Sequence, residues 1–153
     1  MSLLDDLPNG ASVGIDTAPF IYLIEQHARY DPVVAPFFRD RIKPGRNQGV
    51  TSVITVAEVL VQPLRRNQPE LIARYDAAMR RGRHIRLVDI SHEVARRAAQ
   101  LRATFNLRLP DAFQIAAALE HGATHFLTND ARLKKVTDLT VLVLDDYLPA
   151  PAL

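Results

Sequence analysis

Four acidic residues occupy positions from which side chains distant along the chain can meet. They are Asp16, Glu58, Asp111 and Asp130. In a parallel α/β sheet the carboxyl ends of the strands converge on one crevice, and these residues follow strand-like segments or lie in the helices after them. Carboxylates packed so closely repel one another unless a divalent cation neutralises them. Hard oxygen ligands, in a chain without cysteine, select Mg²⁺ or Mn²⁺ over Zn²⁺, so the pattern predicts a metal site.

Each acid also has an explanation in local structure. Asp16 precedes a helix whose first turn holds Pro19, which is typical of a helix cap. Thr55-Val-Ala-Glu58 matches a capping box. Against that second explanation, Glu58 lies in an apolar run, where an ionised carboxylate is costly unless it is paired or bound to a cation.

Other kinds of chemistry find little support in the sequence. The five histidines form no metal-binding pair at close helical spacing; they are His27, His84, His92, His121 and His125. There is no Gly-x-Ser-x-Gly elbow and no glycine-rich phosphate loop. A phosphatase of the haloacid dehalogenase type needs a second acid two positions after Asp16, where this chain has Ala18.

Strand-like and helix-like segments alternate along the chain. Strands are expected at 12–15, 49–53, 85–88, 124–127 and 141–144. Helices are expected from Pro19, at 33–42, around Glu58 but ending before Pro63, at 69–81, at 91–105, at 111–121 and, short, at 131–135. This alternation predicts an α/β fold, a three-layer α/β/α sandwich with a mostly parallel sheet of about five strands.

The length of 153 residues fits a single domain, 1–153, in which residues 1–11 form an irregular leader. No apolar run approaches the ~18 residues that cross a bilayer, and the start of the chain does not resemble a signal peptide. We therefore expect a cytoplasmic protein without a membrane partner.

The formal net charge of +2 says little, but basic residues are clustered in two runs. The runs are Arg39, Arg41, Lys43 and Arg46, and Arg80, Arg81, Arg83 and Arg86. Such clusters can contact phosphates, although a solvated surface is an equally ordinary explanation for either run.

Four short motifs follow one another along the chain: Gly14-Ile-Asp16-Thr17, Val56-Ala-Glu58-Val-Leu60, Leu109-Pro-Asp111-Ala and Leu127-Thr-Asn-Asp130. With these motifs in this order, the chain resembles the PIN domain family, and within it the VapC-like toxins of toxin–antitoxin pairs. The resemblance spans about residues 13–147.

The resemblance implies an endoribonuclease that depends on Mg²⁺ or Mn²⁺. Asp16, Glu58, Asp111 and Asp130 would be the catalytic and metal-holding residues, with the hydroxyls of Thr17 and Thr128 supporting them. It also implies an RNA substrate, a small antitoxin protein as partner and a homodimer. The alternative is a catalytically inactive PIN-like module that binds RNA or serves as a scaffold.

Overall fold

The computed structural model describes residues 1–152, which fold around one five-stranded parallel sheet. The strands are β1 (Ser12–Ile15), β2 (Gln48–Ser52), β3 (Ile85–Val88), β4 (His125–Thr128) and β5 (Thr140–Val143), in the order β3-β2-β1-β4-β5. All four pairings are parallel. The predicted parallel α/β sheet of about five strands is confirmed.

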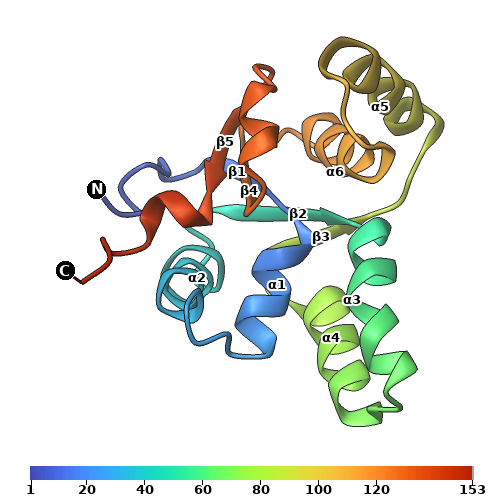
Figure 1. Ribbon diagram of the computed structural model, residues 1–153. Helices are drawn as coiled ribbons and strands as arrows, with labels where there is room; N and C mark the ends of the chain where they lie inside the picture. Colours follow the sequence, from blue (N-terminus) through green and yellow to red (C-terminus); the bar gives the residue numbers. More distant parts are fainter. Residues whose placement is uncertain (153) are drawn as a thin grey trace.

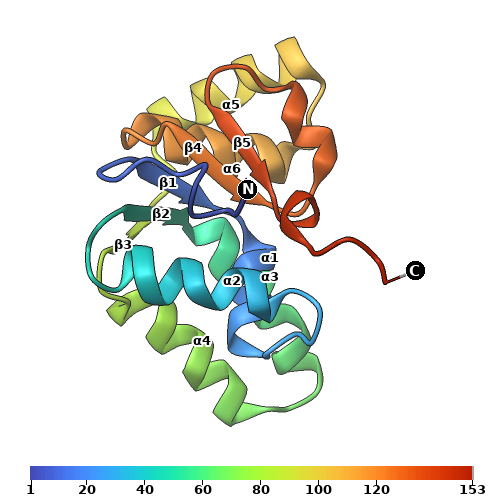
Figure 2. The same cartoon turned by 90° about the vertical axis from the view of Figure 1, so that its left-hand side faces the viewer.

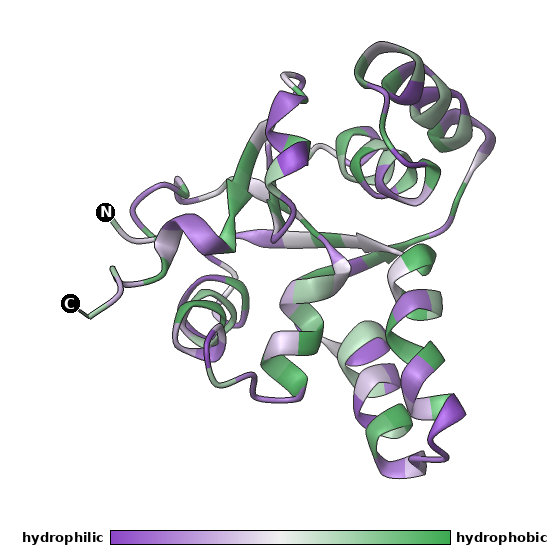
Figure 3. Ribbon diagram, viewed as in Figure 1, coloured by the Kyte–Doolittle hydropathy of each residue, from purple (hydrophilic) through white to green (hydrophobic). Residues whose placement is uncertain are grey.

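Helices cover both faces of the sheet, as Figure 1 and Figure 2 show. One face carries α1 (Thr17–Ile24), α2 (Asp31–Phe37), α3 (Val53–Arg65) and α4 (Pro69–Arg81), and the other carries α5 (His92–Phe105) and α6 (Leu109–Glu120). Short helical turns η1 (Phe38–Ile42), η2 (Ala131–Lys135) and η3 (Leu144–Tyr147) complete the fold. In Figure 3, α1 is hydrophobic along most of its length whereas α4 is mixed. None of the helices in residues 1–152 is both long and apolar enough to cross a membrane.

The strand order puts β1 at the centre, between β2 and β4. The chain proceeds from β1 to β2 and β3 on one side, then returns to β4 and β5 on the other, so the order reverses between β1 and β4. Ligands of open α/β sheets bind beyond the carboxyl ends of the strands at such a reversal. Asp16 directly follows β1, and Asp130 lies two residues after β4.

Helix α6 lies unusually close to the sheet because β1 has a glycine opposite it. A Cβ on Gly14 would stand 2.6 Å from the Cβ of Ala118 and 2.6 Å from Cδ2 of Phe126. The small side chains of α6 and the glycine of β1 therefore match one another, and this match fixes where the helix that carries Asp111 sits over the sheet.

Three local predictions were wrong. Helix α3 does not end before Pro63 but continues to Arg65, because Val59 and Pro63, four residues apart, are both buried on one packing face. The helix expected over 33–42 divides into α2 and the π-helical turn η1 after Phe37. The capping box is absent as well, since Ser52 caps α3 by accepting from the amide of Ile54 at 3.2 Å and Thr55 lies inside the helix.

The first eleven residues contain no helix or strand, but they pack against the rest of the protein. Leu3 and Leu7 are buried in the same core as β1. The side-chain amide of the buried Asn47 donates to the carbonyl oxygens of Pro8 at 2.7 Å and Ala11 at 2.9 Å. These contacts hold the leader against the segment that enters β2.

Candidate active site

Asp16 lies at the junction of β1 and α1 and is both a helix cap and a member of an acidic group. Its Oδ1 accepts from the amide of Thr17 at 2.8 Å, and its Oδ2 accepts from the hydroxyl of Thr128 at 2.7 Å. Burial raises the pKa of Asp16 to about 6, and the negative charges of Asp111 and Glu58 raise it too, against the opposing effect of the two hydrogen bonds. Three of the four predicted acids are therefore close enough to act on one another.

Glu58 is held at this site by a hydroxyl rather than by a helix cap. Its Oε1 accepts from the hydroxyl of Thr17 at 2.9 Å. Thr17 thus contacts Asp16 through its amide and Glu58 through its side chain. The apolar context of Glu58 is explained by its place on α3, where Val59 faces the core and Glu58 itself is exposed.

Asp111 and Asp130 line one small hollow of about 60 Å³, together with Arg108, Arg132 and Lys135. Asp111, whose side chain is only 12% exposed, pairs with Arg108 through an Nε–Oδ2 contact of 3.0 Å. Asp130 pairs with Arg132 at 2.7 Å and also accepts from the amide of that residue at 3.0 Å. Arg132 keeps the pKa of Asp130 below its usual value.

Thr128 joins the acids that follow β1 and β4. Its hydroxyl is fully buried, donates to Asp16 and accepts from the amide of Asp130 at 3.1 Å. A single side chain therefore fixes Asp16 relative to the turn that carries Asp130.

A buried polar network behind the acids was missed by the sequence analysis. Gln114 of α6 accepts from the hydroxyl of Ser52 at 2.6 Å and donates to the hydroxyls of Thr55 and, at 3.4 Å, Thr17. Gln114 lies three residues after Asp111, so both face the same way on α6. A polar residue in the apolar run of that helix was the signal that would have identified it.

The chemistry of the donor set fits a hard divalent cation. The four predicted side chains offer carboxylate oxygens alone. Burial raises the pKa of Asp16, and the charges of Asp111 and Glu58 add to that rise, which a bound cation would offset. Within residues 1–152, no three histidine, aspartate or glutamate side chains lie close enough together, in their present orientations, to hold a metal ion. Arg108 and Arg132 supply the positive charge beside Asp111 and Asp130.

The sequence from residue 13 to 139 matches the model of the PIN domain family. This chain belongs to the PIN domain family. PIN domains are nuclease domains that generally use divalent metals, so membership indicates a hydrolase in the broad sense. No curated protein matches the chain significantly.

Solved structures with the same fold come from toxin–antitoxin systems. A toxin–antitoxin complex from Klebsiella pneumoniae is 24% identical with a TM-score of 0.64, and the match covers 88% of this chain and 98% of that one. DNA-bound VapBC from Salmonella typhimurium is 15% identical with a TM-score of 0.66, with the same coverage of 88% and 98%. VapC20 from Mycobacterium tuberculosis, a toxin that cleaves the sarcin–ricin loop, is 15% identical with a TM-score of 0.60, covering 76% and 87%.

Proposed function

We propose that this protein is a divalent-metal-dependent endoribonuclease and the toxin of a toxin–antitoxin pair. The observation that carries the proposal is the convergence of acids from separate segments at the carboxyl edge of the sheet. Thr17 joins Asp16 to Glu58, Thr128 joins Asp16 to the turn of Asp130, and Asp130 and Asp111 line one hollow. Family membership and a fold shared with a sarcin–ricin-loop-cleaving toxin support RNA as the substrate.

Asp16, Glu58, Asp111 and Asp130 would hold Mg²⁺ or Mn²⁺ through their carboxylate oxygens. A divalent cation in such a site lowers the pKa of water and stabilises negative charge on phosphoryl oxygens. Thr17 and Thr128 orient the carboxylates of Glu58 and Asp16 through the hydrogen bonds described above. The rest of the catalytic contribution of the chain is to exclude bulk water from Asp16 and to bring the phosphate close.

Arg108 and Arg132 are suited to binding that phosphate. Their side chains are 64% and 71% exposed, and each is paired with one of the site's own carboxylates. The carboxylates are largely buried, at 12% and 24% exposed, but the guanidiniums are open to solvent and an RNA phosphate can reach them. Both guanidiniums are therefore free to exchange a carboxylate for an RNA phosphate, to which arginine binds with two parallel hydrogen bonds.

The experiment that tests this function is cleavage of RNA with purified protein. We expect cleavage in Mg²⁺, its loss in EDTA, and loss in Asp111→Asn of at least about a hundredfold, because removal of a charged group that acts in the transition state has effects of that order. Asp138→Asn is the matched control, because Asp138 is exposed and outside the acidic site. Cleavage that survives both EDTA and Asp111→Asn, with unchanged circular dichroism and melting, would reject the proposal.

The second candidate is an RNA-binding or scaffold module without catalysis. The ion pairs that occupy Asp111 and Asp130 favour it, because each acid has a partner within the chain. Calorimetry separates the two candidates. The module predicts no binding of Mg²⁺ or Mn²⁺ and an RNA affinity that Asp16→Ala does not reduce.

An apolar groove of about 470 Å³ supports a small antitoxin as protein partner. Its floor includes Phe20 and Phe38, and its rim carries Arg39, Lys43 and Arg83, so both basic runs of the sequence reach it. An amphipathic segment with acidic residues beside its apolar face would suit this surface. One of the similar structures is named a toxin–antitoxin complex and another VapBC, which supports an antitoxin as the partner.

Helix α3 supports a homodimer. Val61 and Leu64, three residues apart and so on one side of the helix, are 42% and 61% exposed. Large apolar side chains on one exposed helix face are typical of protein interfaces. Pairing of this face with its copy in a second chain would bury both residues.

A further inference from the structure

Three aromatic side chains gather between the end of α1 and the start of α2. The rings of Tyr22 and Tyr30 are stacked, with centroids 4.3 Å apart and planes inclined by 12°. His27 packs against both, at 4.9 Å and 5.0 Å, and is itself exposed to solvent. The protein thus presents a small platform of π systems at its surface.

Arg29 and Asp145 add charge to this platform. The guanidinium carbon of Arg29 lies 5.5 Å from the centre of the Tyr30 ring, and its Nη2 is 3.8 Å from Oδ1 of Asp145. The hydroxyl of Tyr30 donates to the same Oδ1 at 2.7 Å. The side chains of Arg29 and Asp145 are 66% and 52% exposed, so this long ion pair is readily opened by a ligand.

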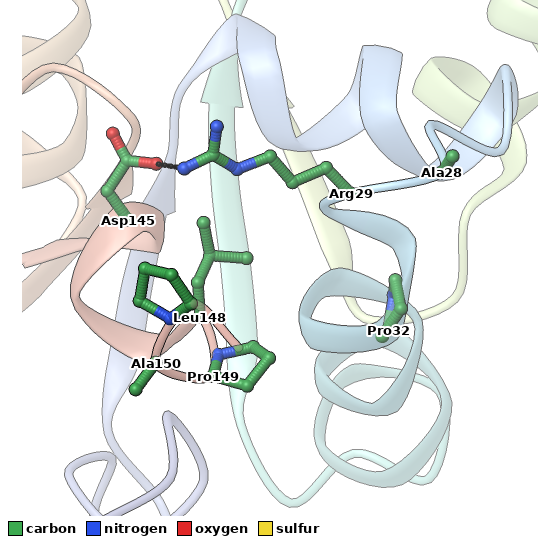
Figure 4. A pocket seen from close by; sticks show the side chains of 8 residues that line it. Ala28, Arg29, Pro32, Asp145, Leu148, Pro149 and Ala150 are labelled. Atoms are coloured by element: carbon green, nitrogen blue, oxygen red, sulfur yellow. Dashed lines mark ion pairs between the residues drawn. The ribbon is translucent and has the colours of Figure 1, made fainter. Parts of the chain in front are cut away.

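A hollow of about 670 Å³ lies directly beside Arg29 and Asp145. Figure 4 shows Arg29 reaching toward Asp145 on one side, with Leu148 and Pro149 near the chain's end on the other and Pro32 across from them. Its volume falls in the range that suits small organic ligands. The hollow therefore combines apolar walls with one guanidinium and one carboxylate.

This hollow is connected to the acidic site through Asn129, the residue between Thr128 and Asp130. The side-chain amide of Asn129 donates to the hydroxyl of Tyr22 at 3.2 Å, and its Oδ1 accepts from the amide of Asp145 at 3.1 Å. The turn after β4 therefore carries Asp130 toward the acids and Asn129 toward the aromatic platform. A ligand in the hollow would lie beside the proposed site of cleavage.

We propose that this hollow, the base site, receives an unpaired nucleobase of the RNA next to the phosphate that is cleaved. The inference rests on the proposed ribonuclease function and names the form of RNA that it takes. Single-stranded bases bind proteins by stacking on aromatic rings and arginine planes. Arg29 lines the hollow and offers such a plane, whereas Tyr30 lies behind it, with its ring stacked on Tyr22 and in contact with Arg29. A base inside a duplex is not available for such stacking.

The carboxylate of Asp145 favours a base over a phosphate in this hollow, because it repels anions. The carboxylate also favours a base with N–H donors. Guanine presents two adjacent N–H donors on its Watson–Crick edge. Uracil presents one, between two acceptor oxygens. The base site therefore selects guanine over uracil. The same carboxylate disfavours an acidic protein segment as the occupant.

The test measures how tightly the protein binds RNA in EDTA, where no cleavage occurs. Binding is monitored by fluorescence anisotropy. The probe is a fluorescein-labelled RNA of ten nucleotides, adenine throughout except for one central guanine. It is compared with the same RNA carrying a central uracil, and with the first RNA paired to its complement. The proteins are wild type, Tyr30→Leu, Tyr30→Phe, Arg29→Ala and Arg97→Ala. Arg97→Ala is the control, because Arg97 lies on α5 and pairs with Glu120 of α6.

We expect Arg29→Ala to bind the single strand about tenfold more weakly, in line with the loss of one base stack. Tyr30→Leu should also bind it more weakly, because this variant removes the ring that contacts Arg29 and the hydroxyl that donates to Asp145. Tyr30→Phe keeps the ring and should bind within about twofold of wild type, as should Arg97→Ala. Wild type should prefer the guanine probe, and the duplex should bind equally to all five proteins. Arg29 is exposed in a loop, so Arg29→Ala should fold like wild type. It therefore reports on binding even if Tyr30→Leu lowers the melting temperature.

Single-strand affinities that are unchanged in Tyr30→Leu and Arg29→Ala would overturn the base site, as would equal losses for single strand and duplex. If those variants instead weaken only a complex with the antitoxin, the hollow is a protein-binding site and the proposal is wrong. These outcomes are separate from the proposed function, because cleavage in Mg²⁺ is tested by Asp111→Asn, which leaves the base site intact.

Discussion

Asp16 has two roles that conflict at the level of one residue. Its carboxylate caps α1 and accepts from two groups, which favours the charged form, but burial and two neighbouring acids disfavour that form more strongly. Its pKa of about 6 in the folded protein lies above the ordinary value of 3.8. The ionised carboxylate therefore destabilises the folded state above about pH 6, and this cost disappears as the pH falls toward 3.8.

We accordingly expect Asp16→Asn to be more stable than wild type in EDTA at pH 8, by about 1–2 kcal/mol or roughly 3–5 °C. Asparagine keeps the size of the side chain and an oxygen that accepts from the amide of Thr17. Thermal melts followed by circular dichroism at pH 8 and pH 4 measure the difference, which should vanish at pH 4. A variant that is less stable at both pH values would contradict this explanation of the raised pKa.

Asp138→Asn is the control for that comparison, since Asp138 is exposed and its loss should leave the pH dependence as in wild type. Addition of Mg²⁺ should then raise the melting temperature of wild type and not of Asp16→Asn, because a cation that binds the folded state stabilises it by mass action.

At the scale of secondary structure elements, the acidic site depends on the hydrogen bonds that join α6 to β2 and α3. Gln114 of α6 contacts Ser52 at the end of β2 and Thr55 within α3, and all three side chains are buried. No side-chain N or O atom buried within residues 1–152 lacks a hydrogen-bond partner. The network therefore positions Asp111 relative to Glu58 without leaving an unsatisfied polar group.

We expect Gln114→Ala to lower stability by about 2–4 kcal/mol, because it leaves the hydroxyl of Ser52 without its acceptor, removes one of the two donors to the hydroxyl of Thr55 and opens a cavity. The melting temperature should fall by roughly 5–10 °C, and metal-dependent cleavage should fall as well. Gln100→Ala, an exposed glutamine on α5, should change neither quantity. A Gln114→Ala protein that melts like wild type would contradict the role given to this network.

The elements themselves were largely predictable from local sequence. The predicted ranges 12–15, 85–88 and 69–81 coincide with β1, β3 and α4, because clear apolar periodicity and flanking turn residues define them. Pro63 and the π-helical turn after Phe37 were not predictable, since burial against other elements overrides local preference there. In the same way, the sequence identified the acids at strand ends but not Gln114, whose partners come from distant segments.

At the scale of the whole molecule, the carboxyl edge of the sheet carries the acidic site and α3 presents the apolar residues Val61 and Leu64 on its outer side. If the protein forms the proposed homodimer through this face, we expect Leu64→Glu to be a monomer, because a buried unpaired charge at an apolar interface is costly. Multi-angle light scattering after gel filtration measures the mass.

The matched control is Ala77→Glu on the exposed side of α4, which adds the same charge outside that surface and should keep the mass of wild type. If Leu64→Glu keeps the mass of wild type while it stays folded, the dimer uses another face or the protein does not dimerise through α3.

We propose that Asp16, Glu58, Asp111 and Asp130 together hold a divalent cation. Anomalous X-ray diffraction from crystals soaked in Mn²⁺ locates such an ion. We predict a manganese peak between the carboxylates of Asp16 and Asp111, at about 2.0–2.3 Å from their oxygens, with Arg108 and Arg132 turned away from the acids. Crystals that bind manganese only elsewhere, with both arginines still paired to Asp111 and Asp130, would show that these four acids do not form a metal site.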